Sequence, residues 1–213
     1  EVNQKVLVQI NECYEEFGRG VLILGDSHGI DLFNALLSTG KIPFLIAIAK
    51  AGCRPDTRMQ HCPFAEVYKL ISDYSGFFLG VLYTQSGATF FRDSHTSHLQ
   101  TKAIEDTYSY LSKIGVKTKV YWLGPQPQLT RDITSFDLFA PSIDVNYDVR
   151  FNSLDTYLTE FMSRKSDTSV SYLSKFQLLT FRNEDFLIDG RVTYSNRDHW
   201  SSYGEEIFGS RMV

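Results

Sequence analysis

The stretch that decides the fold is Val21-Leu22-Ile23-Leu24-Gly25-Asp26-Ser27-His28-Gly29. Its four apolar residues make a strand-sized run, and a helical pattern follows, so the chain turns sharply from strand to helix at Ser27. A serine at that place has its backbone N–H at a helix N-terminus, beside its hydroxyl. The hydroxyl can attack an ester carbonyl, and the N–H can bind the oxyanion that forms. Gly-Asp-Ser is also an ordinary capping string, and we expect Asp26 to cap the helix.

Three more apolar runs, at residues 44–49, 77–83 and 116–123, alternate with helical patterns. This alternation predicts an α/β protein, a three-layer α/β/α sandwich with a mainly parallel sheet. Helices are expected over residues 4–17, 99–114 and 153–164. Residues 124–152 read as a surface excursion that borders the active site, and residues 170–189 show little pattern.

The composition bounds the function. The chain has 213 residues, 43% of them apolar and 22% charged, and a net charge of -4. One domain over residues 1–213 is expected, with a helical extension at 1–19 and a catalytic core at 20–213. A negative net charge does not favour binding to nucleic acid, and no apolar run is long enough to span a bilayer. The chain has no initiating Met, which predicts an excised domain or mature fragment.

A second polar block, Asn196-Arg197-Asp198-His199-Trp200-Ser201, stands near the end of the chain. His199 would lie on the loop before a short last helix, which we expect Ser201 to cap. An imidazole there can take the Ser27 proton as general base.

In this order, the two blocks resemble the SGNH hydrolase superfamily of GDSL-like esterases and acetyltransferases. The form Gly-Asp-Ser-His, the later Ala51-Gly52-Cys53-Arg54-Pro55 and the closing residues 194–204 are most similar to SGNH domains fused to acyltransferase-3 membrane proteins, which O-acetylate bacterial surface polysaccharides. The resemblance implies a serine acyl-enzyme that needs no cofactor or metal, an acyl donor and a polysaccharide acceptor. It also implies a periplasmic domain, tethered to the inner membrane through an acyltransferase-3 domain absent from this chain.

The family places an aspartate three residues before the histidine to orient the imidazole, and here that position holds Asn196. An amide oxygen can accept a hydrogen bond from the ring, but it brings no negative charge. Asp198 is the alternative, although an immediate neighbour of His199 should point elsewhere. We therefore expect Asn196 to orient the ring.

The family's oxyanion hole implies backbone donors at Ser27 and Gly52. Its third donor follows the third strand, where this chain has no Gly-x-Asn. By residue type, the amide of Gln85 is the candidate there.

His28 and Trp200 are candidate substrate-binding residues, because they adjoin the nucleophile and the base. The plainer alternative for each is packing, since aromatic rings beside a sheet are usually core. The cluster Arg92-Asp93-Ser94-His95 with His98 reads as a solvated loop rather than a metal site.

The chain has three cysteines, at positions 13, 53 and 62. Cys53 and Cys62 bracket an irregular segment, and a disulfide between them is the preferred interpretation, which implies an oxidising compartment. Reduced thiols in a cytosolic protein are the alternative. Cys13 is expected to be a buried free thiol.

Three functions compete. The first is an O-acetyltransferase that moves an acetyl group through Ser27 to a sugar hydroxyl. The second is a carbohydrate O-acetylesterase, which differs only in whether water resolves the acyl-enzyme. The third is a catalytically weak glycan-binding module, suggested by Asn196 and the missing third donor.

Overall fold

The computed structural model describes residues 4–55, 62, 64–93, 96–136 and 145–213. Its centre is a parallel sheet of five strands in the order β2-β1-β3-β4-β5. The strands are β1 (Gly20–Gly25), β2 (Leu45–Ala49), β3 (Phe78–Thr84), β4 (Val120–Leu123) and β5 (Val170–Leu173). A separate hairpin pairs β6 (Leu187–Ile188) with β7 (Arg191–Val192).

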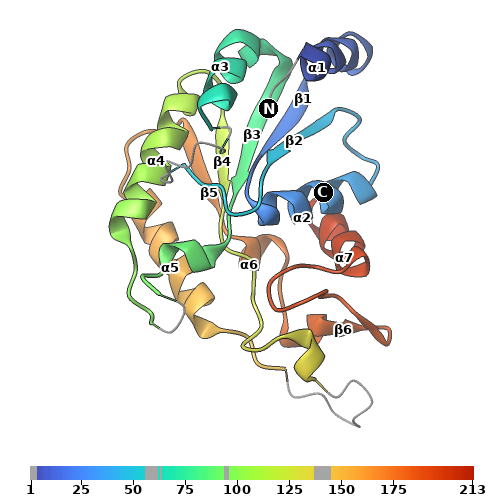
Figure 1. Ribbon diagram of the computed structural model, residues 1–213, viewed down its shortest axis with the longest axis vertical. Helices are drawn as coiled ribbons and strands as arrows, with labels where there is room; N and C mark the ends of the chain where they lie inside the picture. The colour runs from blue at the N-terminus through green and yellow to red at the C-terminus, as the bar shows by residue number, and fades with distance from the viewer. Residues whose placement is uncertain (1–3, 56–61, 63, 94–95, 137–144) are drawn as a thin grey trace.

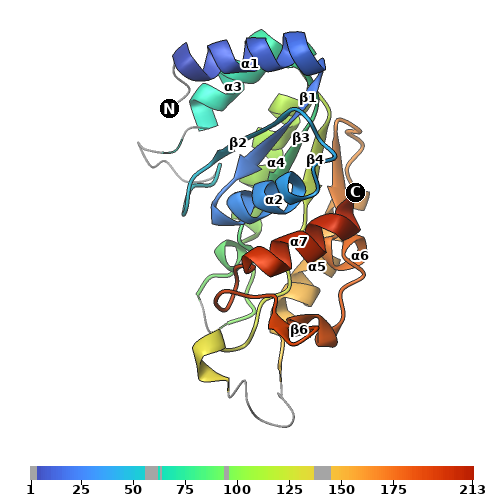
Figure 2. The ribbon, with the colours of Figure 1, turned by 90° about the vertical axis from the view of Figure 1, so that its right-hand side faces the viewer.

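Helices cover both faces of the sheet (Figure 1). One face carries α3 (Phe64–Tyr74), α4 (Thr101–Gly115) and α5 (Val149–Ser163), and α1 (Gln4–Phe17) packs into the same cluster through Ile10. The other face carries α2 (Ser27–Ser38), α6 (Lys175–Leu178) and α7 (Ser202–Met212), and α2 and α7 lie side by side (Figure 2). Short 3-10 turns lie at Ser75–Phe77, Gly87–Phe90, Ile133–Ser135 and Asn183–Phe186. The predicted three-layer α/β/α architecture is confirmed.

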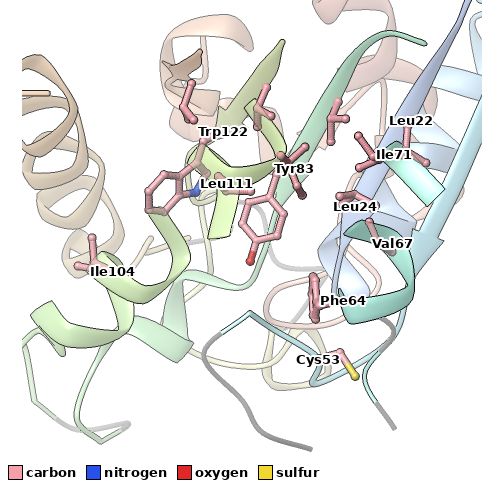
Figure 3. Close-up of a cluster of buried hydrophobic side chains, with 14 of the residues drawn as sticks. Leu22, Leu24, Cys53, Phe64, Val67, Ile71, Tyr83, Ile104, Leu111 and Trp122 are labelled. Atoms are coloured by element: carbon pink, nitrogen blue, oxygen red, sulfur yellow. The ribbon is translucent and has the colours of Figure 1, made fainter. Parts of the chain in front are cut away.

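The core follows from the alternation of side chains along the strands. Leu22 and Leu24 of β1 enter the cluster beneath α3 and α4, where Figure 3 shows them near Val67 and Ile71. Ile23, between them, points the other way and packs under α2. Because both faces of β1 are buried, the strand reads as a continuous apolar run.

Two elements begin four residues away from their predicted starts, and one strand was not predicted. β4 begins at Val120 rather than at residue 116, because the chain before it still forms the closing turn of α4. α5 begins at Val149, where the Asp148 carboxylate caps it by accepting the N–H of Arg150. The sequence did not predict β5, the edge strand beside β4.

The close packing of α7 depends on two glycines. A Cβ on Gly209 would meet the backbone oxygen of Ala35 in α2, and a Cβ on Gly204 would meet the backbone oxygen of Thr193. Only a residue without a side chain lets the two backbones approach this closely. Among the described residues, no helix combines the length and the apolar character needed to cross a membrane.

Candidate active site

The carboxyl ends of all five strands lead into one end of the molecule. Five residues follow them in chain order: Ser27 after β1, Gly52 after β2, Gln85 after β3, Gln126 after β4 and Lys175 after β5. The strand order changes direction between β1 and β3, and in open α/β sheets ligands bind at the carboxyl ends beside such a switch point. The fold thus places the Ser27 turn where a site is expected.

Asp26 fastens the turn that carries Ser27. One carboxylate oxygen accepts the N–H of His28 at 2.9 Å, and the other accepts the N–H of Ser86, beyond β3, at 2.8 Å. The side chain is buried, so these bonds are shielded from water. The expected cap is confirmed, and Asp26 also ties the ends of β1 and β3 together.

His199 reaches the site from the loop that precedes α7. The loop is held by paired backbone segments on either side, with Tyr194 bridged to Trp200 and the N–H of Ser195 bonded to the carbonyl of His199. The expected Ser201 cap is confirmed, because its hydroxyl accepts the N–H of Gly204. These contacts give the imidazole a defined position over α2.

The imidazole is oriented by a residue that sequence reasoning missed. Nδ1 of His199 lies 2.9 Å from Oδ2 of Asp31, on α2, which is the geometry of a ring N–H donated to a carboxylate. The hydrogen bond to Asp31 raises the pKa of His199 above its ordinary 6.5, while partial burial opposes the rise. The bond leaves Nε2, on the far side of the ring, as the nitrogen that can take a proton.

Ser27 begins the helix that carries Asp31. Asp31 follows Ser27 by four residues on α2, so the two share one face of the helix. The ring of His28 lies 5.2 Å from the ring of His199, measured between centroids. The structure records no hydrogen bond from the Ser27 hydroxyl to the ring, and catalytic hydrogen bonds are often long until a substrate binds.

The prediction that Asn196 contacts the imidazole is corrected. Its Oδ1 accepts two backbone N–H groups, from Asp198 at 2.9 Å and from His199 at 2.8 Å. The side chain therefore shapes the loop and does not touch the ring. Asp198 does not replace it, because its carboxylate lies 3.7 Å from Nε2 of His28. That interaction with His28 lowers the pKa of Asp198.

A signal for Asp31 was present in the sequence. A carboxylate one helical turn after the candidate nucleophile, on a helix whose buried face is mostly apolar, is costly to bury without a partner. Asp31 is only 7% exposed. The family pattern, which places the orienting aspartate three residues before the histidine, points to position 196 and not to Asp31.

Asp31 also bonds to Gln126, and Gln126 in turn bonds to Lys175. Nε2 of Gln126 donates to the same Oδ2 of Asp31 at 3.2 Å and also donates to the carbonyl of Asp198. Oε1 of Gln126 accepts a bond from Nζ of Lys175 at 3.3 Å. Lys175 is fully buried, and this burial lowers its pKa to about 8, against the opposing charges of Asp31 and Asp26.

The two candidate substrate-binding rings are both inside the protein. His28 is 0% exposed and Trp200 is 3% exposed. Trp200 packs on Phe208 at 5.0 Å between ring centroids. Stacking of a sugar on Trp200 is therefore wrong, and so is direct contact of His28 with a substrate, because neither ring presents a face to solvent.

The two remaining oxyanion candidates differ. Gly52 lies in an exposed turn after β2 with φ of 74°, a conformation that favours glycine. Gln85 is buried, and its amide is already bonded, accepting from the Tyr83 hydroxyl and donating to Thr89 at 2.6 Å. Gln85 therefore supports the end of β3 through both ends of its amide, and its role as an oxyanion donor stays a prediction. The donor positions of Ser27 and Gly52 stay predictions.

The predicted disulfide is confirmed, because Cys53 and Cys62 are bonded across nine positions of sequence. It closes the chain just after Gly52. Cys13 is a free thiol, as expected, and is half-buried.

Among the described residues, one group of side chains could approach a metal ion together: His28, Asp198 and His199, whose ligand atoms lie within 4.8 Å of one another. Nε2 of His28 and Oδ2 of Asp198 lie 3.7 Å apart, against about 3.3 Å for ligands around tetrahedral zinc. We assign no metal to this group. His95, in the other histidine cluster, lies outside the described residues.

Comparison with known proteins places the chain. A family model described as "SGNH domain (fused to AT3 domains)" matches residues 6–213. The chain belongs to the SGNH family. Together with the serine, histidine and carboxylate described above, this membership makes it a serine-dependent acyl-transfer or esterase enzyme. No curated protein matches the chain significantly.

Solved structures share the SGNH fold. The periplasmic domain of a lipopolysaccharide acetyltransferase from Salmonella ser. Paratyphi A superposes with a TM-score of 0.70 at 16% identity, covering 100% of this chain and 88% of that one. The carbohydrate acetylesterase Est24 from Sinorhizobium meliloti gives 0.51 at 13% identity, covering 90% and 94%. A GDSL-like lipase from Bacteroides thetaiotaomicron gives 0.52 at 11% identity, covering 99% and 95%.

Proposed function

We propose that this SGNH domain is an O-acetyltransferase that moves an acetyl group through Ser27 to a sugar hydroxyl of a bacterial surface polysaccharide. The observation that carries the chemistry is the 2.9 Å contact between His199 and Asp31, one helical turn from Ser27. The family's fusion to AT3 domains and the fold shared with a lipopolysaccharide acetyltransferase domain support the acetyl transfer and the sugar acceptor.

In the first half of the reaction, the hydroxyl oxygen of Ser27 attacks the acetyl carbonyl while Nε2 of His199 takes its proton. The oxyanion accepts hydrogen bonds from the N–H groups of Ser27 and Gly52. The bond between the acetyl carbon and the donor then breaks, and the leaving group takes the proton from His199, which leaves an acetyl ester on Ser27. Throughout, Asp31 acts as a positioning residue, holding the proton of Nδ1 and stabilising the imidazolium.

In the second half, a sugar hydroxyl enters where the donor's leaving group departed. His199 takes its proton, the sugar oxygen attacks the acetyl ester, and the serine oxygen leaves with the proton from His199. The acetyl group ends on the sugar, and Ser27 is restored. In this proposal an acyltransferase-3 membrane domain delivers the acetyl group, and this domain works in the periplasm beside the inner membrane. The disulfide agrees with an oxidising compartment.

A carbohydrate O-acetylesterase is the second candidate function. The imidazole of His199 is 25% exposed, so water as well as a sugar can reach the acyl-enzyme. The fold shared with Est24 favours the same chemistry. A glycan-binding module without catalysis is less well supported, because Asp31 supplies the carboxylate that the Asn196 position lacks.

The test uses hydrolysis of p-nitrophenyl acetate and then acetyl transfer to an oligosaccharide, followed by mass spectrometry. Ser27→Ala should abolish both reactions, while Ser153→Ala, on the exposed face of α5, should change neither. Acetylated oligosaccharide from the parent supports the transferase, and acetate alone supports the esterase. Equal rates for the parent and Ser27→Ala would refute both enzyme proposals.

A further inference from the structure

Lys175 is a charged residue that the proposed reaction does not use. It begins α6 directly after β5, with no exposed surface, and its Nζ lies 5.7 Å from the centre of the Trp200 ring. A fully buried ammonium group is costly and is rarely retained without partners. Its Nζ donates a hydrogen bond to Oε1 of Gln126. The position of this lysine therefore calls for an explanation beyond packing.

The chain of contacts from Lys175 leads to the base. Nζ donates to Oε1 of Gln126, and Nε2 of Gln126 donates to Oδ2 of Asp31. The same oxygen contacts Nδ1 of His199. A carboxamide has one acceptor end and one donor end, so the lysine at the acceptor end fixes which end Gln126 turns toward Asp31. With Gln126 turned in this way, the carboxylate of Asp31 faces the NH2 group of the amide and not its oxygen.

We infer that Lys175 and Gln126 are positioning residues that hold Asp31 against His199 and limit the basicity of the imidazole. The inference rests on the proposed role of His199 as the general base. Gln126 acts through geometry, because it anchors the oxygen that the ring also uses. Lys175 acts mainly through charge, because a cation near the pair disfavours the imidazolium.

The surrounding charges allow the sign of each effect to be stated. The carboxylates that act on His199 are Asp31, Asp198 and Asp26, and all three favour the imidazolium. Asp31 and Asp26 act on Lys175 as well, and both favour its charged form. Lys175 is therefore a buried positive charge that opposes these carboxylates.

Loss of each residue should shift the pKa of His199 in opposite directions. Lys175→Met removes the charge but keeps the length of the side chain, so the pKa of His199 should rise by about 0.5 to 1 unit. Gln126→Leu loosens Asp31, whose hydrogen bond is the main cause of the raised pKa, so the pKa should fall. Arg211→Met is the matched control, because it also deletes one cation and breaks the ion pair with Asp185, away from the site. It should leave the pKa of His199 unchanged.

The experiment is an NMR titration of the His199 imidazole in the parent and the three variants, with the pH profile of kcat/KM for p-nitrophenyl acetate measured beside it. The turnover number of Gln126→Leu should fall about 10-fold with little change in KM, a loss typical of outer hydrogen-bond partners. The result that overturns the inference is a folded Lys175→Met protein in which the pKa of His199 stays at the parent value or falls. Because the NMR titration needs no turnover, an inactive parent would refute the proposed function while this test still gives its answer.

Discussion

Replacing Asp31 by asparagine should reduce kcat/KM for ester hydrolysis by about 10²- to 10³-fold. In serine proteases the same change costs about 10⁴-fold, because the amide holds the imidazole in the wrong tautomer. Here Nε2 of Gln126 donates to the same Oδ2 that faces the ring, so an asparagine should turn its oxygen, not its NH2 group, toward both donors. The tautomer of His199 is then kept, and what is lost is the negative charge.

That charge sets the magnitude. Two unit charges about 4 Å apart interact by about 4 kcal/mol at an effective dielectric of about 20. Because each tenfold change in rate is about 1.4 kcal/mol, the whole interaction corresponds to about 10³-fold. The imidazole is 25% exposed, so water screens part of the interaction, and 10²-fold is the lower bound. Asp31→Ala should lose more, because it also leaves Nδ1 without an acceptor.

The assay is hydrolysis of p-nitrophenyl acetate by the parent, Asp31→Asn, Asp31→Ala and Asn196→Asp, with thermal unfolding to verify the fold. Asn196→Asp should not raise activity, since the side chain at 196 accepts backbone N–H groups and does not reach the ring. The reasoning is refuted if Asp31→Asn keeps activity within threefold of the parent, or if Asn196→Asp increases it tenfold.

Three further predictions concern pH, the disulfide and helix packing. Because the pKa of His199 is raised and the base acts when neutral, kcat/KM should fall as pH drops through a pKa above 6.5, and a transition below pH 6 would contradict this. Removing the disulfide with Cys53→Ser and Cys62→Ser should lower the free energy of unfolding by about 2 to 3 kcal/mol in urea denaturation, and an unchanged midpoint would contradict it. Gly209→Ala should destabilise by about 2 kcal/mol or more although alanine favours helices, because its Cβ meets the backbone of Ala35. A neutral or stabilising Gly209→Ala would show that α7 can move away from α2 at little cost.

Part of the fold could be predicted from neighbouring residues alone. The central strands were predicted correctly because burial on both faces requires continuous apolar runs, and such runs are visible in the sequence. β5 was missed for the opposite reason. As an edge strand it is short, and only Val170 of its four residues is fully buried, so Ser171 and Tyr172 interrupt the apolar pattern.

The candidate site divides in the same way. His28 and Trp200 looked like substrate contacts because they adjoin the reacting residues in sequence, yet both rings turn inward. Gln85 has the right chemical type, but its neighbours Tyr83 and Thr89 use its amide. Adjacency and residue type state what a side chain can do, whereas its direction depends on the surrounding packing.

The sequence by itself determined the nucleophile turn, because Gly25, Asp26 and Ser27 are consecutive and their conformation is set by the strand before them and the helix after them. Only the tertiary structure decided the partner of the base. Asp31 and His199 are 168 positions apart, and no local pattern joins them. They meet because α7 packs closely on α2, and that packing sets the loop before α7 beside the helix that carries both Ser27 and Asp31.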